Sequence, residues 1–397
     1  MPRAAGSVCY GYIRTPIRTS SQSHHPLPAS FVQPIDALPK FGSLSLDNLV
    51  KGTPVGDEQA WATMIDVAKR SRTSLKTVSR VVNGEPNVSP ATAEKVRQAM
   101  EELGYRRNES ASLLRRGKST GSIALVLEDS SGPFFAALVV AIEQVARMNG
   151  YLLFTGGAEG DPVRAARLTE AFLDRRVDGL ILASSLAGSR AVDDAVPTSV
   201  PAVFVERPSR DGTRDTVLAD NAGGIGSAVA HLAAQGHRRI GYVGDDPAYF
   251  TAIERRDGFV AAIAAAALPA DVPILMDGGA ALSDPEVLSR WTSGPDPVTA
   301  VVTGNNRTSR RLLYALRRQP QIDLGFVCFD EWEMADLMRP SVTTVDQNAD
   351  AIGLSAAEQL LSRIAGADHP ARCTVLPTRL TIRESGTLGL HRVAHAL

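Results

Sequence analysis

The 397-residue sequence lacks the features that mark membrane-bound, secreted or disulfide-rich proteins. No apolar run approaches the roughly 18–20 residues that a membrane-spanning helix needs. The first apolar stretch is short and is followed by Arg14 and Arg18, unlike a secretory signal. The cysteines, Cys9, Cys328 and Cys373, are far apart and show no metal-ligand spacing. These absences predict a cytoplasmic protein with reduced thiols and no membrane partner.

Catalytic and cofactor motifs are also missing. The sequence has no G-x-S-x-G, no paired carboxylates at helical spacing, no metal-ligand cluster and no phosphate loop. GGIG at 223–226 lacks the third glycine of a dinucleotide loop, which favours close backbone packing over nucleotide binding. We therefore expect no enzyme, with no catalytic residue, no metal and no cofactor.

Charge is unevenly distributed, although the net charge is only −1. Residues 60–120 hold 12 Lys and Arg against six acidic residues, whereas residues 121–397 hold 25 against 33. A basic module joined to an acidic one is typical of a protein in which one part binds a polyanion. A solvated charged face explains many such clusters too, so charge alone leaves both interpretations open.

Residues 1–107 divide into two segments with different sequence patterns. Residues 1–59 are rich in Pro, Ser and Gly without sustained periodicity, which predicts a disordered extension. Residues 60–107 have helical spacing instead, and Ile65, Val67 and Ala68 are expected on one face of a first short helix.

Two further helices are predicted in residues 60–107. Ser74 can cap a helix that begins at Leu75, and Ser89 followed by Pro90 can begin another that ends at Gly104. Their expected inward residues are Val78, Val81, Val82, Val96, Met100 and Leu103. Three short helices with a tight first connection indicate a helix-turn-helix head.

Beyond residue 121, short apolar runs alternate with amphipathic segments such as 136–148 and 161–175, as in parallel α/β sheets. The expected strands are 123–127, 151–154, 179–183 and 202–205, then 240–244, 273–276, 300–303 and 325–329. The predicted fold class is α/β, with an N-terminal helix-turn-helix head plus two doubly wound lobes. A ligand is expected at the carboxyl ends of the strands.

Motifs spread over residues 64–397 carry a specific resemblance. In order, the chain contains DVAK, TVSRVVNG, NVSP, ELGYRRN, RRVDGLIL, HLAAQGHRRIGYVG, RRDGF, FDE, PSVTTVDQ and IRES. Together they resemble the LacI/GalR-type bacterial transcriptional regulators. The resemblance implies a hinge helix and linker at 108–120 and a core at 121–397 resembling periplasmic sugar-binding proteins. Lobe one would comprise about 121–219 and 349–372, and lobe two about 220–348 and 373–397.

The same resemblance implies that the second helix of the head enters the major groove of DNA. Leu75 and Lys76 match positions that vary with operator sequence, and Arg80 matches a base-reading position. The implied phosphate contacts are Thr77, Ser79 and Asn83. For Arg80 the alternative is an ordinary solvated helix residue.

One departure from the family lies at the turn before this helix. Arg72-Thr73 stands where the family usually has Gly-Val. Glycine adopts positive φ easily, whereas arginine loses on the order of 1 kcal/mol. Arg70 also replaces a usual apolar residue. A less stable head and an additional phosphate contact from Arg72 are both open interpretations.

In the hinge, Asn108, Ala111 and Leu114 match family positions that contact DNA. Leu114 corresponds to a leucine wedge in the minor groove, with Ala111 as the small residue beside it. Because such a wedge needs two copies on one axis, a homodimer on a near-palindromic double-stranded operator is implied. A tetramer stays open.

In the core, Phe134, Arg255, Asn305 and Asp330 match positions that line the family's effector cleft. Charge-assisted hydrogen bonds from such residues can hold hydroxyls while an aromatic ring stacks on a sugar face. Asn306 stands where the family usually has Asp, so the pocket is atypical. The implied effector is a small molecule of the carbohydrate class.

The sequence therefore predicts a DNA-binding transcriptional regulator, a repressor, whose operator affinity an effector modulates. Release by the effector is expected, although strengthened binding stays open. The alternatives are a solute-binding protein of sugar uptake, against which the basic head argues, and an enzyme on an α/β scaffold.

Overall fold

The computed structural model describes residues 62–105, 119–184 and 190–387. Residues 62–105 belong to one compact unit and the described residues from Ser119 onward to another, so each is described by itself. The predicted extension at 1–59 and the hinge positions Asn108, Ala111 and Leu114 lie outside the described residues. Within the described ranges, no helix has both the length and the apolar content to cross a membrane.

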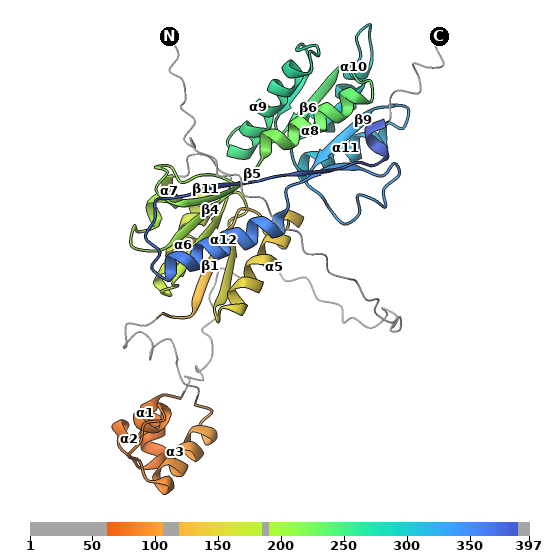
Figure 1. The fold of residues 1–397 in the computed structure, drawn as a ribbon. Helices are drawn as coiled ribbons and strands as arrows, with labels where there is room; N and C mark the ends of the chain where they lie inside the picture. Colours follow the sequence, from red (N-terminus) through yellow and green to blue (C-terminus); the bar gives the residue numbers. More distant parts are fainter. Residues whose placement is uncertain (1–61, 106–118, 185–189, 388–397) are drawn as a thin grey trace, which may run out of the picture. The chain divides into compact units, whose positions relative to one another are not determined.

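The head (residues 62–105) consists of α1 (Met64–Ser71), α2 (Leu75–Val82) and α3 (Pro90–Glu102) (Figure 1). Ser74 accepts a hydrogen bond from the Thr77 amide and Ser89 from the Thr92 amide, which confirms both predicted caps. The centre of the head is formed by Val67, Ala68, Val78, Val96 and Ala99, with Val81, Val82, Met100 and Leu103 packed against them.

The expectation for Ile65 is wrong, because its side chain is 55% exposed. Two residues along an α-helix correspond to a rotation of about 200°, so Ile65 and the buried Val67 lie on nearly opposite faces of α1.

Arg72 ends α1 in the left-handed conformation, with φ 53° and ψ 41°. This confirms that the turn needs the backbone geometry for which glycine is the usual choice. The neighbouring Arg70 is exposed and forms an ion pair with Glu102 of α3. An ion pair at the surface contributes little to stability.

The core contains two six-stranded sheets with the same plan. In the first, the strand order is β11-β5-β4-β3-β1-β2, and in the second it is β12-β10-β9-β8-β6-β7. The first comprises β1 (Ser122–Leu127), β2 (Leu152–Gly157), β3 (Gly179–Ala183), β4 (Ala202–Val205), β5 (Asp215–Ala219) and β11 (Cys373–Leu376). The second comprises β6 (Ile240–Gly244), β7 (Ile274–Met276), β8 (Ala300–Thr303), β9 (Gly325–Phe329), β10 (Thr343–Asp346) and β12 (Arg379–Thr381). Among the strand pairings of the described residues, only that of β10 with β12 is antiparallel.

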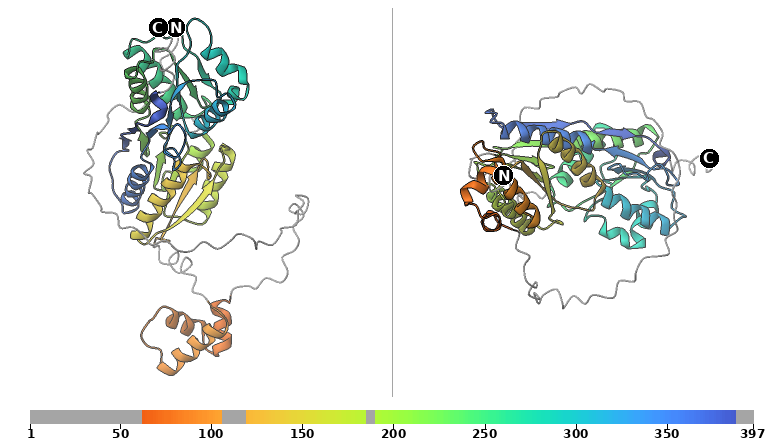
Figure 2. Two further views of the ribbon diagram at one scale, coloured as in Figure 1. Left: turned by 90° about the vertical axis from the view of Figure 1, so that its right-hand side faces the viewer. Right: turned by 90° about the horizontal axis from the view of Figure 1, so that it is seen from below.

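Helices cover both faces of each sheet (Figures 1 and 2). On the first sheet, α5 (Pro133–Met148) and α12 (Ala349–Ile364) lie side by side on one face, with α6 (Pro162–Asp174) and α7 (Arg190–Ala195) on the other. On the second sheet, α8 (Asn221–Ala234) and α9 (Phe250–Ala265) pack opposite α10 (Pro285–Thr292) and α11 (Asn306–Arg318). Short 3-10 helices lie at Ala280–Ser283 and Glu384–Thr387. We call the two halves lobe one and lobe two.

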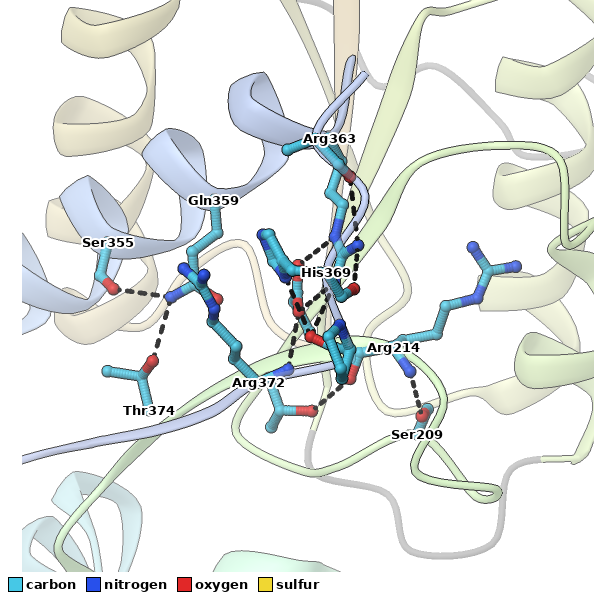
Figure 3. A network of polar contacts seen from close by, with 12 residues as sticks. Ser209, Arg214, Ser355, Gln359, Arg363, His369, Arg372 and Thr374 are labelled. Atoms are coloured by element: carbon cyan, nitrogen blue, oxygen red, sulfur yellow. Dashed lines mark hydrogen bonds and ion pairs between the residues drawn. The ribbon is translucent and has the colours of Figure 1, made fainter. Parts of the chain in front are cut away.

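The predicted lobe boundary at residue 372 is wrong. Residues 373–376 form β11, which pairs with β5 in lobe one, so the final crossover to lobe two follows Leu376. Asp215 explains this placement, because it accepts hydrogen bonds from Arg363 Nε at 2.6 Å and from the Arg372 amide at 2.8 Å. Figure 3 shows the two donors, Arg363 and Arg372. Gln359 of α12 also donates to Thr374 at 3.2 Å (Figure 3).

The glycine-rich stretch at 223–226 is part of α8 and serves packing, as the sequence predicted. A Cβ atom on Gly224 would lie 2.8 Å from Thr378 Oγ1 and 2.9 Å from a methyl group of Val345. The helix can therefore approach the second sheet closely only with glycine at this position.

Candidate functional sites

The first candidate site is the exposed start of α2 in the head. Leu75 is 48% exposed and Lys76 is exposed beside it, while Val78, almost one turn further along α2, is fully buried. An exposed leucine at the first turn contributes nothing to the head's own core. It leaves α2 with an apolar and a cationic group that can reach another surface.

The other predicted DNA-contacting residues of the head lie further along α2. Arg80 retains 41% side-chain exposure, and its Nε lies 3.9 Å from a carboxylate oxygen of Glu85. The Thr77 hydroxyl lies 2.8 Å from that of Ser74, and Asn83 donates from Nδ2 to the Ser79 hydroxyl at 3.3 Å. These hydroxyls are part of the local capping of α2, and none of them is deeply buried.

The second candidate site is a cavity of about 310 Å³ between the lobes. The carboxyl ends of several parallel strands supply its walls, which is where ligands bind in open α/β sheets. Phe134, Arg255, Asn305 and Asp330 all line it. The structure thus brings together the four residues that the sequence singled out, from segments almost 200 positions apart.

Arg255 reaches the cavity from α9 and is only 3% exposed. Its Nε donates to Asn221 Oδ1 and its Nη1 to the Gly304 carbonyl, each at 2.7 Å. The guanidinium lies 4.0 Å from the centre of the Phe329 ring. Its Nη2 has no hydrogen-bond partner, so one fixed donor remains for a ligand.

Asp330 directly follows β9 and has φ 75°, a conformation that costs a non-glycine residue on the order of 1 kcal/mol. Its carboxylate accepts a hydrogen bond from the Asn306 amide at 2.9 Å, at the start of α11, and another from Gln347 Nε2. Asn305 caps the same helix and donates to Asp245 at 2.6 Å. Asp330 is therefore held by uncharged donors, and it is not ion-paired with Arg255.

Glu206 lines the cavity from lobe one, and the sequence analysis missed it. It directly follows β4, has φ 72°, is 6% exposed, and its Oε1 has no hydrogen-bond partner. Burial raises the pKa of its carboxyl to about 7, although the nearby Arg255 opposes the shift. The available signal was an acidic residue at the end of an apolar strand, the same pattern that marks Asp330.

Other cavity residues were also missed. Asp245 forms an ion pair with Arg307, whose guanidinium lies 5.8 Å from the centre of the Tyr249 ring. Burial raises the pKa of the Tyr249 hydroxyl. Trp332 is partly buried and packs against the core of lobe two. Within the described ranges, no three His, Cys, Asp or Glu side chains are arranged to hold a metal ion.

A helix-turn-helix head joined to a two-lobed, ligand-binding core defines a class of two-part DNA-binding regulators. Residues 63–108 match the family described as bacterial regulatory proteins, lacI family, and residues 229–386 match the periplasmic binding protein-like domain. The ribose operon repressor of Escherichia coli strain K12 is 32% identical over 314 residues, covering 76% of this chain and 93% of that protein.

Two solved structures extend the comparison. The transcriptional regulator CelR in complex with cellobiose is 29% identical with a TM-score of 0.59. The lac repressor dimer bound to operator and an anti-inducer is 24% identical with a TM-score of 0.67, a likeness of fold. Both comparisons cover 82% of this chain and 99% of the solved chain. The chain belongs to the lacI family of bacterial regulatory proteins and is a DNA-binding transcriptional regulator.

Proposed function

We propose that this protein is an effector-responsive repressor that acts as a homodimer on a near-palindromic operator in the cytoplasm. The observation that carries the proposal is the exposed start of α2, where neither Leu75 nor Lys76 is buried in the small core of the head. The ribose operon repressor, a relative at 32% identity, has a repressor function by name.

In this proposal α2 lies in the major groove. Leu75 packs on a thymine methyl group, while Lys76 and Arg80 donate to guanine O6 and N7. Thr77, Ser79 and Asn83 contact phosphates and set the register of the head. In each subunit the hinge contributes Asn108, Ala111 and Leu114, with Leu114 inserted in the minor groove at the dimer axis.

The effector in this proposal is a small carbohydrate that occupies the cavity between the lobes. Phe134 stacks on its ring, while Arg255, Asn305 and Asp330 hold its hydroxyls. The cavity of about 310 Å³ is at the small end of the range for ligand sites, which suits a ligand of monosaccharide size. Cellobiose, the ligand named in the CelR structure, is a related case.

Coupling between the cavity and the head has a physical route through lobe one. Asp178, next to β3, accepts hydrogen bonds from the Ser119 hydroxyl at 2.7 Å and the Thr120 amide at 2.9 Å. These two residues begin the described core after the hinge, so a ligand-driven shift of lobe one moves the start of the chain that leads to the head. A ligand that prefers one lobe arrangement then releases the operator.

The experiment that tests this function is operator selection from a random DNA pool, followed by binding measurements on variants. Arg80→Ala should lower affinity for the selected operator by about 1–3 kcal/mol and relax sequence preference at one position. Arg97→Ala is the matched control, since Arg97 is an exposed arginine of α3 in the same head. Equal losses for Arg80→Ala on selected and random DNA would show that Arg80 contacts only phosphate, and failure to select any sequence would refute the regulator function.

A further inference from the structure

The side chains that line the cavity include many more acidic than basic groups. Six carboxyl groups line it, those of Glu128, Asp129, Glu159, Glu206, Asp245 and Asp330, against the two guanidinium groups of Arg255 and Arg307. With every carboxyl ionised, the lining has a formal charge of −4. Because the cavity is partly closed from solvent, this field is screened less than on an open surface.

Both cations of the lining are already engaged. Arg307 is ion-paired with Asp245, and Arg255 uses Nε and Nη1 on the uncharged groups of Asn221 and Gly304. No lysine or histidine is among the lining residues. The two arginines therefore cannot balance the six carboxyl groups of the lining, and a bound molecule that carries positive charge would reduce the excess.

The unpaired polar atoms point to the same kind of ligand. Glu206 Oε1 and Gln347 Oε1 are buried acceptors without a donor, and Arg255 Nη2 is a buried donor without an acceptor. A ligand that completes the site must supply at least two N–H or O–H donors and one acceptor oxygen. An ammonium group supplies three donors together with a positive charge, whereas each hydroxyl supplies one donor and no charge.

Glu206 is the natural partner of such an ammonium group. The charges that act on it come from Arg255 of α9, Asp330 after β9 and Glu128 after β1, so two of the three are acidic. Burial raises the pKa of its carboxyl to about 7. A neutral ligand would leave the ionised carboxyl buried with only Arg255 opposing the two acidic neighbours, which is unfavourable.

We infer that the effector carries a protonated amine in addition to its hydroxyls, as an amino sugar does, and that Glu206 binds the ammonium group. This inference rests on the proposed function, because it names the chemical class of the ligand for the same cavity. The ammonium group lies between Glu206 and Gln347, and a ring oxygen or hydroxyl accepts from Arg255.

The test is binding of matched ligands to the full-length protein, measured by thermal shift and calorimetry. The probes are D-glucosamine, D-glucose and N-acetyl-D-glucosamine, with the corresponding galacto and manno sets and with ethanolamine as a minimal hydroxyl-bearing amine. At least one free amine should bind about tenfold more tightly than both its neutral counterparts, a difference of about 1.4 kcal/mol. Equal or tighter binding of the neutral members, or no binding by any amine at millimolar concentration, would overturn the inference.

Variants assign the preference to one residue. Glu206→Gln should abolish the preference for the amine, Glu206→Asp should retain part of it, and Glu170→Gln should leave it unchanged. Glu170 is an exposed carboxylate of α6 outside the cavity lining, which makes it the matched control. A preference that survives Glu206→Gln would refute the role of Glu206.

The pH dependence separates charge pairing from simple hydrogen bonding. If Glu206 binds an ammonium group, affinity should rise as pH increases from 4.5 toward 7, because the carboxyl ionises over this range. Affinity that falls over this range would show that a protonated Glu206 donates to a neutral ligand, which overturns the inference. Operator binding without ligand, measured on the same preparation, tests the proposed function separately, because it depends on the head rather than on the cavity.

Discussion

The two lobes of the core present the same structural position with different chemistry. Glu206 follows β4 and Asp330 follows β9, and each of these strands is third in its own sheet. Both residues have a left-handed backbone, with φ 72° and 75°. Each amide donates to the neighbouring strand, Glu206 to Val217 at 3.3 Å and Asp330 to Val345 at 2.9 Å.

The difference lies in what surrounds each carboxylate. Asp330 accepts hydrogen bonds from the Asn306 amide and from Gln347, whereas Glu206 has an unpaired Oε1 and a raised pKa. On the proposed function, the lobe-two half of the site is preorganised before a ligand binds, whereas the lobe-one half would be completed by the ligand. A ligand that satisfies Glu206 thereby favours the arrangement in which lobe one faces it, which is the differential interaction that a switch needs.

The lobes also differ in the burial of two ion pairs, one in each lobe, and in this respect it is lobe one that has the buried, paired carboxylate. Lobe one contains a deeply buried pair, Asp215 with Arg363, in which the carboxylate side chain is 1% exposed. In lobe two, the pair of Arg239 with Asp271 is at the surface. In lobe one, a buried carboxylate outside the cavity lining is ion-paired, whereas the buried carboxylate in the lining, Glu206, has an oxygen without a hydrogen-bond partner.

The largest effect is expected from Asp215→Ala. Breaking a buried pair leaves Arg363 without its partner, and such losses cost about 3–5 kcal/mol. Urea unfolding of the full chain should show a lower midpoint, and Asp271→Ala in lobe two should change it little because that pair is exposed. Similar midpoints for both variants would contradict the contrast between the lobes.

The same pair has a predictable pH dependence. Although burial opposes ionisation, the hydrogen bonds from Arg363 and the Arg372 amide hold the pKa of Asp215 below its usual value. The stabilisation is therefore present above the unfolded-state pKa and is lost as pH falls through the lower folded-state pKa. Acid titration of the wild type against Asp215→Ala should show the two stabilities converging at low pH.

The next largest effect on stability is expected at Glu206, on the lobe-one side of the cavity. Burial raises the pKa of Glu206 from 4.5 to about 7, a difference that corresponds to on the order of 3 kcal/mol. Since the folded-state pKa is the higher one, ionisation of the carboxyl destabilises the folded protein as pH rises from 4.5 to 7. Glu206→Gln should therefore be more stable than the wild type at pH 8 and nearly equal to it at pH 4.5. A constant difference across pH would mean that Glu206 does not titrate in this range.

Much of the fold was predictable because its strands are short, continuous apolar runs. The predictions for β3, β4, β6, β8 and β9 match the structure residue for residue. The four strands β5, β10, β11 and β12 were not among the predicted strands, since three to five residues with mixed polarity carry little periodicity. Their pairing depends on long-range contacts such as that between Asp215 and Arg363, and these cannot be read locally.

Of the cavity residues, only those that match a family motif could be predicted from the sequence. Phe134, Arg255, Asn305 and Asp330 were found through the family resemblance, and the structure brings them to one cavity. Glu206 was missed because a single acidic residue after a strand also fits an ordinary turn. Its significance depends on burial, on backbone geometry and on the absence of a partner, which only the folded chain reveals.

The smallest expected effect is on ligand response, and it tests whether both lobes are needed for it. Asp330→Ala removes the preorganised carboxylate but lies in a different unit from the head, so binding to the operator without ligand should be unchanged. The ligand from the panel that weakens operator binding in the wild type should do so through a coupling of about 1–3 kcal/mol, and the variant should lose that coupling. The measurement is a gel shift with and without ligand, and the melting temperature without ligand reports whether the fold is retained. Glu206→Gln is the matched variant on lobe one.

Loss of response in both variants would mean that the ligand must bridge the two lobes. A full response in Asp330→Ala would place ligand sensing in lobe one alone and would contradict the preorganised role of Asp330.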